Sequence, residues 1–297
     1  MKTRRERLIY LHYLPSMTRR LLYKIKKEDP EWQRIFSTSP QELSTLLHIP
    51  IKKAVPLYQE IQNTAYYLPQ LQQNVQQIKT LTIYDEAYPE ALKYIPDCPL
   101  VLYAIGDIQL LKSCKSISVI GTRKPSKEAY LKLKHVVEPL LMNNWLIVSG
   151  LAYGVDSLAH RLTLDHQKKT IAVLGSGFFH VYPKPHLPLC KEIGRKGLVL
   201  SEYPPYKKPQ KYFFPERNRI ISGLTQGTLV IEAMERSGTL ITVDQALDQG
   251  KEVYAIPGSP LVPQTKGCLR MLQDGAKLVM DSTDIIEDWR HAPAAKK

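Results

Sequence analysis

From about residue 115 the chain alternates short apolar runs with helix-like segments, and this alternation constrains its fold more than any other feature. Seven runs have the composition of strands: SISVIG (116–121), WLIVSG (145–150), TIAVLG (170–175), GLVLSE (197–202), GTLVIE (227–232), EVYAIP (252–257) and KLVM (277–280). Most are separated by segments with apolar residues at helical spacing. Strands that are apolar throughout and separated by helices form parallel sheets covered on both faces. The pattern therefore predicts an α/β fold with a doubly wound, mostly parallel sheet.

The first 76 residues have a different texture, and helical spacing dominates there. The segment SPQELSTLLHIP (39–50) predicts a helix with Ser39 as its cap and Pro40 in its first turn, ended by Pro50. A glutamine-rich stretch, LPQLQQNVQQIK (68–79), reads as a terminal helix or a linker. The chain length suits two domains. We expect a helical domain over 1–76, a connecting extension packed on the sheet over 77–114, and a sheet domain over 115–297.

Composition limits the partners and the compartment. Lys and Arg total 41 against 28 Asp and Glu, so the formal charge is +13. A chain this basic is expected to meet a polyanion. No apolar window of about 18 residues is present, and the basic N-terminus lacks the apolar core of a secretory signal, so we expect no membrane insertion and a cytoplasmic location. The four cysteines, Cys98, Cys114, Cys190 and Cys268, form no CxxC pair, which favours buried or incidental thiols over a metal site or disulfides.

The run YPPYKKPQKYFFPERNR (203–219) interleaves aromatic and cationic side chains. Aromatic faces stack on unpaired bases and cations meet phosphates, which is the combination that single-strand binding requires. The aromatic members are Tyr203, Tyr206, Tyr212, Phe213 and Phe214, and the cationic ones are Lys207, Lys208, Lys211, Arg217 and Arg219. The run follows the predicted strand 197–202, so it should leave the sheet at its carboxyl edge, where ligands bind in open α/β folds. A proline-rich loop with solvated lysines is the alternative interpretation.

Four strand-to-helix turns carry small residues: Gly121-Thr122-Arg123, Ser149-Gly150-Leu151, Gly175-Ser176-Gly177 and Ser237-Gly238-Thr239. In a doubly wound sheet they share one edge, where helix N-termini hold anions. Arg123 adds a fork of donors suited to phosphate oxygens. Each turn taken alone is an ordinary tight turn. None is a dinucleotide fingerprint, and no Walker A pattern exists. Together they predict an anion groove.

Residue types used in catalysis are present but poorly arranged. His160 and His166 fall on a predicted helix and suit packing or solvation. Ser149 lacks a GxSxG context. Glu232 and Glu235 follow a strand and could act as acid and base, although spacing shows no second partner. We therefore expect a binding protein that is not an enzyme and needs no cofactor or metal.

Five strings closely resemble the DNA-processing protein A family, also called DprA or Smf: SVIGTRKPS (118–126), IVSGLAYGVDSLAHR (147–161), TIAVLGSGFFHVYPKPH (170–186), FFPERNRIISGLTQGTLVIEA (213–233) and SGTLITVDQALDQGKEVYAIPG (237–258). The resemblance spans about 80 to 290 and is close to members from naturally transformable, Bacillus-like bacteria. It implies an extended Rossmann-like domain after a small domain similar to a sterile alpha motif. It also implies single-stranded DNA binding and protection during natural transformation, RecA loading, and a homodimer through the Rossmann-like domain. Single-strand binding proteins are a further candidate partner.

The resemblance also assigns residues. The family's glycine-serine-arginine motif falls on Gly121, Thr122 and Arg123, and the threonine keeps a hydroxyl. The basic residue after the Tyr-Pro pair falls on Lys184, and the FPxRNR motif falls on 214–219. With the turns, the predicted DNA-binding residues are Gly121, Thr122, Arg123, Ser149, Gly150, Gly175, Ser176, Gly177, Lys184, Phe214, Arg217, Asn218, Arg219, Gly238 and Thr239.

The resemblance comes with one departure from the family and one alternative function. Many members carry a winged-helix domain after the Rossmann-like domain, and we expect none here because the sequence stops at HAPAAKK. The alternative function is a nucleotide-processing enzyme of the nucleoside-monophosphate phosphoribohydrolase type. Such enzymes carry PGGxGT with a glutamate soon after, whereas the related position here reads ERSGTLITVD.

Overall fold

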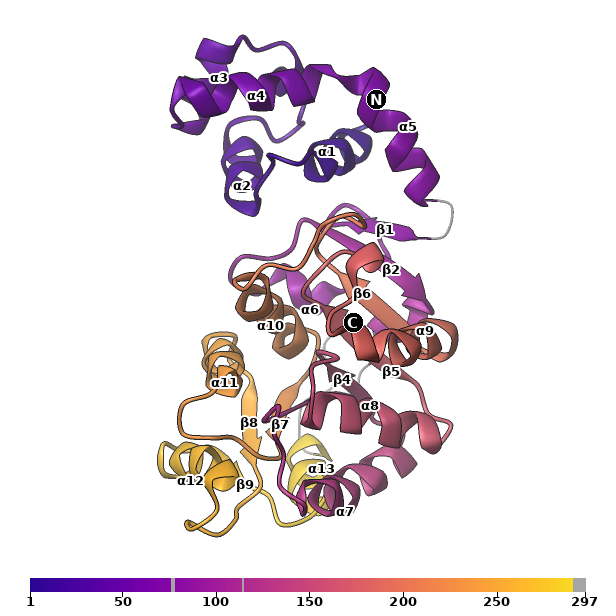
Figure 1. The fold of residues 1–297 in the computed structure, drawn as a ribbon, viewed down its shortest axis with the longest axis vertical. Coiled ribbons are helices and arrows are strands. Elements are labelled where there is room, and N and C mark those ends of the chain that lie inside the picture. Colours follow the sequence, from indigo (N-terminus) through magenta and orange to yellow (C-terminus); the bar gives the residue numbers. More distant parts are fainter. Residues whose placement is uncertain (76–77, 114, 291–297) are drawn as a thin grey trace. The chain divides into compact units, whose positions relative to one another are not determined.

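The computed structural model describes residues 1–75, 78–113 and 115–290 (Figure 1). The chain divides into two compact units. Unit 1 comprises Met1–Tyr88 and Pro99–Ala104, and unit 2 comprises Pro89–Cys98 and the chain from Ile105 onward. The segment expected to connect the domains, 77–114, therefore contributes residues to both units. Cys114 and the last residues of the glutamine-rich stretch before Ile78 lie outside the described residues.

Unit 1 is mainly helical, as its apolar spacing indicated. Its helices are α1 (Arg4–Tyr13), α2 (Arg19–Glu28), η1 (Arg34–Phe36), α3 (Pro40–Leu47), α4 (Ile51–Gln62) and α5 (Thr64–Val75). The predicted start of α3 is confirmed, because Ser39 accepts a hydrogen bond from the Glu42 backbone and Pro40 occupies the first helical position. After α5, β1 (Lys79–Thr82) pairs antiparallel with β2 (Val101–Gly106) in the register Lys79 to Ala104.

Polar side chains fix the helices of unit 1 to its hairpin. The indole nitrogen of the fully buried Trp32 donates to the Tyr84 hydroxyl at 2.8 Å. The Arg5 guanidinium meets the Asp85 carboxylate at 2.7 Å. The first contact joins the segment between α2 and η1, and the second joins α1, to the residues that follow β1.

In unit 2, each of the seven predicted runs forms a strand. The strands are β3 (Ser116–Ile120), β4 (Leu146–Ser149), β5 (Thr170–Leu174), β6 (Leu198–Ser201), β7 (Gly227–Val230), β8 (Glu252–Ala255) and β9 (Lys277–Leu278). The helical segments are α6 (Glu90–Lys93), η2 (Ile108–Lys112), α7 (Ala129–Met142), α8 (Val155–Asp165), η3 (Phe178–His180), η4 (Lys184–His186), α9 (Leu187–Lys196), α10 (Phe213–Gly223), α11 (Gly238–Asp248), η5 (Pro263–Thr265), α12 (Lys266–Gln273) and α13 (Thr283–Arg290).

The strand order of unit 2 is β6-β5-β4-β3-β7-β8-β9, and every neighbouring pair is parallel. This confirms the doubly wound, mostly parallel sheet. The chain winds outward from β3 to β6 and then returns to place β7 on the other side of β3. The direction in which successive strands are added to the sheet reverses between β3 and β7, which makes this position a switch point. In open α/β sheets, ligands bind at such a point, beside the carboxyl ends of the strands.

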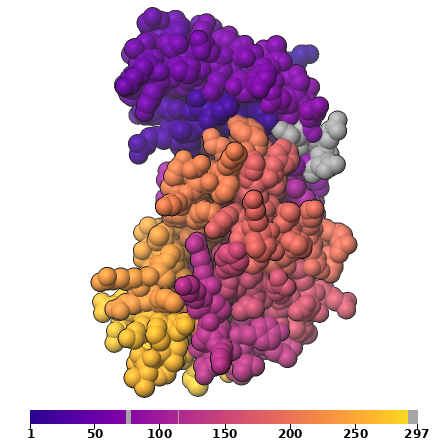
Figure 2. Space-filling view, in the orientation of Figure 1, coloured from indigo at the N-terminus to yellow at the C-terminus, as the bar shows by residue number. Residues whose placement is uncertain are grey.

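Continuous apolar strands give unit 2 its core. Ile117, Val119 and Ile147 are fully buried, and Leu133 and Val137 of α7 pack in the same cluster. In the space-filling view, magenta atoms from the region after β3 lie against orange and yellow atoms from the region after β7 (Figure 2). The rigid sheet thus holds two turns that are far apart in sequence at one edge.

Candidate nucleic-acid interface

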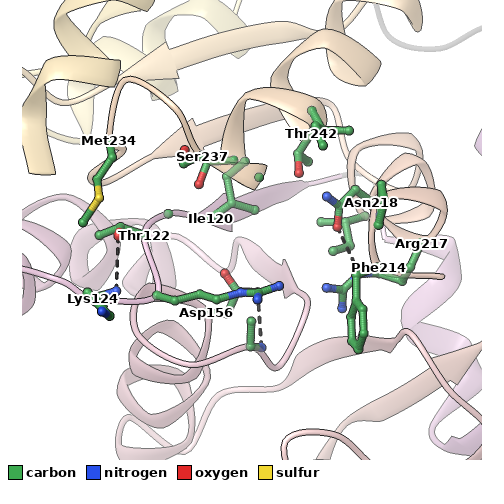
Figure 3. Close-up of a pocket in the computed structure, with 18 residues that line it drawn as sticks. Ile120, Thr122, Lys124, Asp156, Phe214, Arg217, Asn218, Met234, Ser237 and Thr242 are labelled. Carbon is green, nitrogen blue, oxygen red and sulfur yellow. Dashed lines mark hydrogen bonds between the residues drawn. The ribbon is translucent and has the colours of Figure 1, made fainter. Parts of the chain in front are cut away.

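A pocket of about 430 Å³ lies at the carboxyl ends of β3 and β7, at the switch point (Figure 3). Four segments form it: the loop after β3, the turn after β4 with the start of α8, helix α10, and the segment leading into α11 with the first turns of that helix. Its lining residues are Ile120, Gly121, Thr122, Arg123, Lys124, Ala152, Asp156, Phe214, Pro215, Arg217, Asn218, Ile221, Met234, Ser237, Gly238, Thr239, Ile241 and Thr242. In Figure 3, Thr122 and Lys124 come from the first segment, Phe214, Arg217 and Asn218 from the third, and Met234, Ser237 and Thr242 from the fourth.

The loop after β3 presents two cations on a fixed backbone. A Cβ at Gly121 would lie 2.8 Å from the Glu232 carbonyl oxygen and 2.7 Å from the Val155 side chain, so only glycine fits this close approach. The Thr122 amide donates to the Glu232 carbonyl at 2.8 Å, and the Thr122 hydroxyl accepts from the Lys124 amide at 3.2 Å. Arg123 and Lys124 are exposed. This loop therefore offers exposed positive side chains from a hydrogen-bonded turn.

Arg217 supplies a fixed positive charge in the wall of the pocket. Its side chain is buried and donates to the carbonyl oxygens of Gly150 and Val173, and its Nε donates to Asn218 Oδ1 at 3.2 Å. Burial lowers the pKa of Arg217 to about 10. The guanidinium stays protonated at neutral pH, and its carbonyl partners hold its orientation.

A buried carboxyl group, Asp156, also lines the pocket. Its Oδ2 accepts from the Gly150 amide at 3.2 Å and from the Ala152 amide at 3.4 Å. Burial raises the pKa of Asp156, and the charge of Arg217 opposes that shift. Asp156 lies in the family-resembling string 147–161, but it was not among the predicted site residues. The signal that could have found it is position, because it opens the helix after β4 and so shares the edge where the other turns lie.

The start of α11 contributes donors without a charged side chain. Ser237 precedes the helix and makes no capping hydrogen bond, and its hydroxyl oxygen is buried without a hydrogen-bond partner among the described residues. Gly238 and Thr239, in the first turn, line the pocket. Backbone N–H groups at a helix N-terminus carry partial positive charge and hold anions.

The structure brings most of the predicted residues together. Eight of them line the pocket: Gly121, Thr122, Arg123, Phe214, Arg217, Asn218, Gly238 and Thr239. Gly150 lines a small adjoining cavity with Arg123, Tyr153, Tyr182 and Phe214. Gly175 acts indirectly, because a Cβ there would lie 2.8 Å from the Phe214 ring. The turn glycine thus leaves room for that ring.

The other five predicted residues, like Gly150 and Gly175, lie outside the lining of this pocket. The Ser149 hydroxyl is buried and donates to the Val119 carbonyl at 2.7 Å. Ser176 is buried, and the Gly177 amide donates to the Lys207 carbonyl at 2.8 Å. Lys184 is exposed on η4, and Arg219 is buried in an ion pair with Glu202 at 2.5 Å. The sequence of the run 203–219 shows that Arg219 is charged, but not which way its side chain points. Successive residues of α10 face different sides of the helix.

The aromatic residues of the run 203–219 differ in their exposure and direction. Tyr203 and Phe213 are buried and stack on each other with ring centroids 3.9 Å apart. Tyr212 is 59% exposed. Phe214 lies at the pocket, 6.0 Å from the Arg123 guanidinium carbon and 5.5 Å from the Tyr182 ring. Tyr203 and Phe213 therefore stabilise the loop, whereas Tyr212 is exposed and Phe214 lines the pocket.

The carboxylates and histidines considered as catalytic groups do not line the pocket. Glu232 is fully buried and bonded to Ser126 and Lys132, and Glu235 is exposed. His160 pairs with the Thr170 hydroxyl at 2.8 Å, and burial lowers its pKa to about 3. His166 Nε2 lies 2.9 Å from Glu138. His160 lies within α8, and His166 is the residue that caps the C-terminal end of this helix.

No group of three or more His, Cys, Asp or Glu residues among the described residues is arranged to hold a metal ion. In the same part of the chain, no helix is both long and apolar enough to span a bilayer.

The fold and site define a class: a doubly wound α/β protein with a cationic pocket at its switch point. The family model for DNA recombination-mediator protein A matches residues 79–290, and the chain belongs to this family. It is 41% identical over 270 residues to the DNA processing protein DprA of Bacillus subtilis, covering 90% of this chain and 89% of that protein. It is 43% identical over 219 residues to DprA of Streptococcus pneumoniae, covering 74% and 77%.

Solved structures agree with this assignment. The crystal structure of Streptococcus pneumoniae DprA matches with a TM-score of 0.81 and 35% identity, covering 95% of this chain and 96% of that one. Helicobacter pylori DprA, whose structure describes a single-stranded DNA binding mode, matches with a TM-score of 0.66 and 29% identity, covering 72% and 96%. The resemblance drawn from the motifs is confirmed.

Proposed function

We propose that this chain binds single-stranded DNA in the switch-point pocket, protects it during natural transformation, and loads the RecA recombinase onto it. The observation that carries the binding step is the convergence of Arg123, Lys124 and Arg217 with the α11 N-terminus around one pocket. Family membership and the single-stranded DNA binding mode described for the Helicobacter pylori protein support the choice of ligand.

The geometry suggests how a strand would be held. Exposed Arg123 and Lys124 reach phosphates, and buried Arg217 and the α11 N-terminus provide a fixed positive field behind them. Phe214, beside Arg123, offers a ring face to a base, and stacking of this kind contributes about 1–3 kcal/mol per base. Phosphate and stacking contacts carry little base information, so sequence preference should be weak.

The finer parts of the proposal follow from the family. The protein acts as a homodimer through unit 2, so that a second site adds to the effective concentration for a longer strand. RecA and single-strand binding proteins are its protein partners, the cytoplasm is its location, and it binds DNA without turning it over. Faster assembly of RecA on a strand covered by single-strand binding protein, in the presence of this protein, is the test of loading.

A nucleotide-processing enzyme would need a carboxylate free to act in the pocket. Glu232 is engaged with Ser126 and Lys132 and lies outside the lining. Asp156, which does line it, accepts two backbone amides. These contacts favour binding over catalysis, and release of a free base from a nucleoside monophosphate would overturn this reading.

The pocket assignment is tested with Arg123→Ala, using Arg195→Ala on α9 as a matched control, because Arg195 is equally exposed and lies outside the pocket lining. A hydrogen bond to a charged group contributes about 1.5–3 kcal/mol, so Arg123→Ala should weaken binding of a labelled oligonucleotide about tenfold or more. The slope of log K against log salt should shrink by about 0.7 for each lost phosphate contact. Equal binding by the two variants, both with native circular dichroism, would show that the pocket is not the site.

A further inference from the structure

Glu232 follows β7 and is hydrogen-bonded to the loop that follows β3 and to Lys132 of α7. Its residue is fully buried. Its carboxylate accepts from the Ser126 amide at 2.8 Å, from the Ser126 hydroxyl at 2.6 Å and from Lys132 Nζ at 2.8 Å. Its carbonyl oxygen accepts from the Thr122 amide at 2.8 Å. A single residue therefore holds both ends of the segment 122–126.

The segment between these two anchors carries the exposed cations of the pocket. Arg123 and Lys124 lie between Thr122 and Ser126, and both line the pocket. With the ends of the segment fixed, the backbone positions of the two cations are set relative to β7. Because α11 follows β7, the same residue relates the cations to the other wall of the pocket.

Burying a carboxylate in this position is costly, so its presence calls for an explanation. A buried charge is stable only when it is paired and its lone pairs are satisfied, and an apolar residue would often stabilise the fold as well. Here three donors satisfy Glu232, including the largely buried ammonium of Lys132 on α7. The arrangement is directional, which an apolar contact would not be, and it is directed at the loop of the pocket.

We propose that Glu232 is a positioning residue for nucleic-acid binding, which holds segment 122–126 so that Arg123 and Lys124 converge with Arg217. The inference rests on the proposed binding of single-stranded DNA. Glu232 touches no ligand in this account and acts only through the two cations.

The first variant is Glu232→Gln, which keeps the shape but places an amide NH₂ against donors from Ser126 and Lys132. It should weaken binding of a labelled single strand about tenfold, because two charged contacts lose their fixed geometry. Ser126→Ala removes only the hydroxyl bond and should weaken binding in the same direction by about threefold, with less risk to the fold. The control is Glu235→Gln, which makes the same charge change at an exposed position and should not weaken binding.

Combination with the cations separates positioning from general support of the fold. In a chain carrying Arg123→Ala and Lys124→Ala, adding Glu232→Gln or Ser126→Ala should weaken binding by less than about twofold. If Glu232 merely supported the fold, its substitution would weaken binding in this double variant as much as it does in the unaltered protein, because Arg217 and Phe214 would still be disturbed.

The outcomes are distinguishable. If the unaltered protein binds no single strand, the proposed function fails. If the unaltered protein binds a single strand, and both Ser126→Ala and a folded Glu232→Gln bind it as tightly as the unaltered protein does, the positioning role is wrong. Fully multiplicative losses with the cation variants would also overturn it.

Discussion

Replacing Arg219 tests whether this motif arginine contacts DNA or instead stabilises the fold. Arg219 belongs to the FPxRNR motif, and the sequence predicted a DNA contact for it. In the structure its guanidinium pairs with Glu202 at 2.5 Å, and the two side chains are only 6% and 7% exposed. We therefore expect Arg219→Ala to act on the stability of unit 2 and not on DNA affinity.

The magnitude follows from burial. Removing one partner of a buried ion pair costs about 3–5 kcal/mol, because the remaining charge is left uncompensated. In a unit of about 200 residues each kcal/mol shifts the melting temperature by about 2–4 °C, so Tm should fall by about 6–20 °C. Replacing both partners together, with Glu202→Leu and Arg219→Met, should recover much of that loss, since no buried charge remains unpaired.

Thermal melting followed by circular dichroism measures the first effect, and binding of a labelled single strand well below the melting transition measures the second. The folded Arg219→Ala variant should bind within about twofold of the unaltered protein. An unchanged Tm together with weakened binding would refute the reasoning and would return Arg219 to the DNA-contacting residues.

Two further predictions concern Lys184 and His160. Lys184 is exposed and outside the pocket lining, so Lys184→Ala should weaken single-strand binding less than Arg123→Ala does in the same titration; a larger effect would move the strand toward η4. His160 has a folded pKa lowered to about 3, mainly by burial, from an ordinary value of 6.5. The unfolded chain then binds more protons, so stability should fall as pH drops from 6.5 toward 3. Urea unfolding at pH 7 and pH 5 measures this fall in stability, and the free energy of unfolding of His160→Gln should fall less between the two pH values. An identical pH dependence in both proteins would contradict the assignment.

The sheet was predictable because its strands are buried on both faces. Runs such as TIAVLG and GTLVIE are apolar nearly throughout, as strands covered on both faces are, and each forms a parallel strand. Local rules also located the start of α3, where Ser39 and Pro40 specify the cap without help from tertiary contacts. The switch point was not predicted, because strand order depends on which helices cover which face, and the sequence pattern does not record this.

The pocket was predictable to the extent that it consists of strand-end turns. Gly121, Arg123 and Gly238 follow strands, and residues that follow parallel strands lie at the same edge of the sheet, so their proximity could be predicted. Side chains on α10 were less predictable, because the motif shows which residues are present and not where each points. Tyr203 and Phe213 turn inward to stack on each other. The buried contacts of Glu232 were missed, since its partners Ser126 and Lys132 lie 106 and 100 residues away in the sequence. Asp156 was missed because only its place at the strand edge marks it as a site residue.

The central claim is tested most directly by titrating the protein with a fluorescent single-stranded oligonucleotide across a salt series, with duplex of equal length and nucleoside monophosphates as competitors. The account predicts that log K falls linearly with log salt, by about 0.7 for each phosphate contacted, and that the duplex and the mononucleotides displace the strand poorly. Binding that is insensitive to salt, or that a mononucleotide abolishes, would contradict a pocket built to hold a DNA strand.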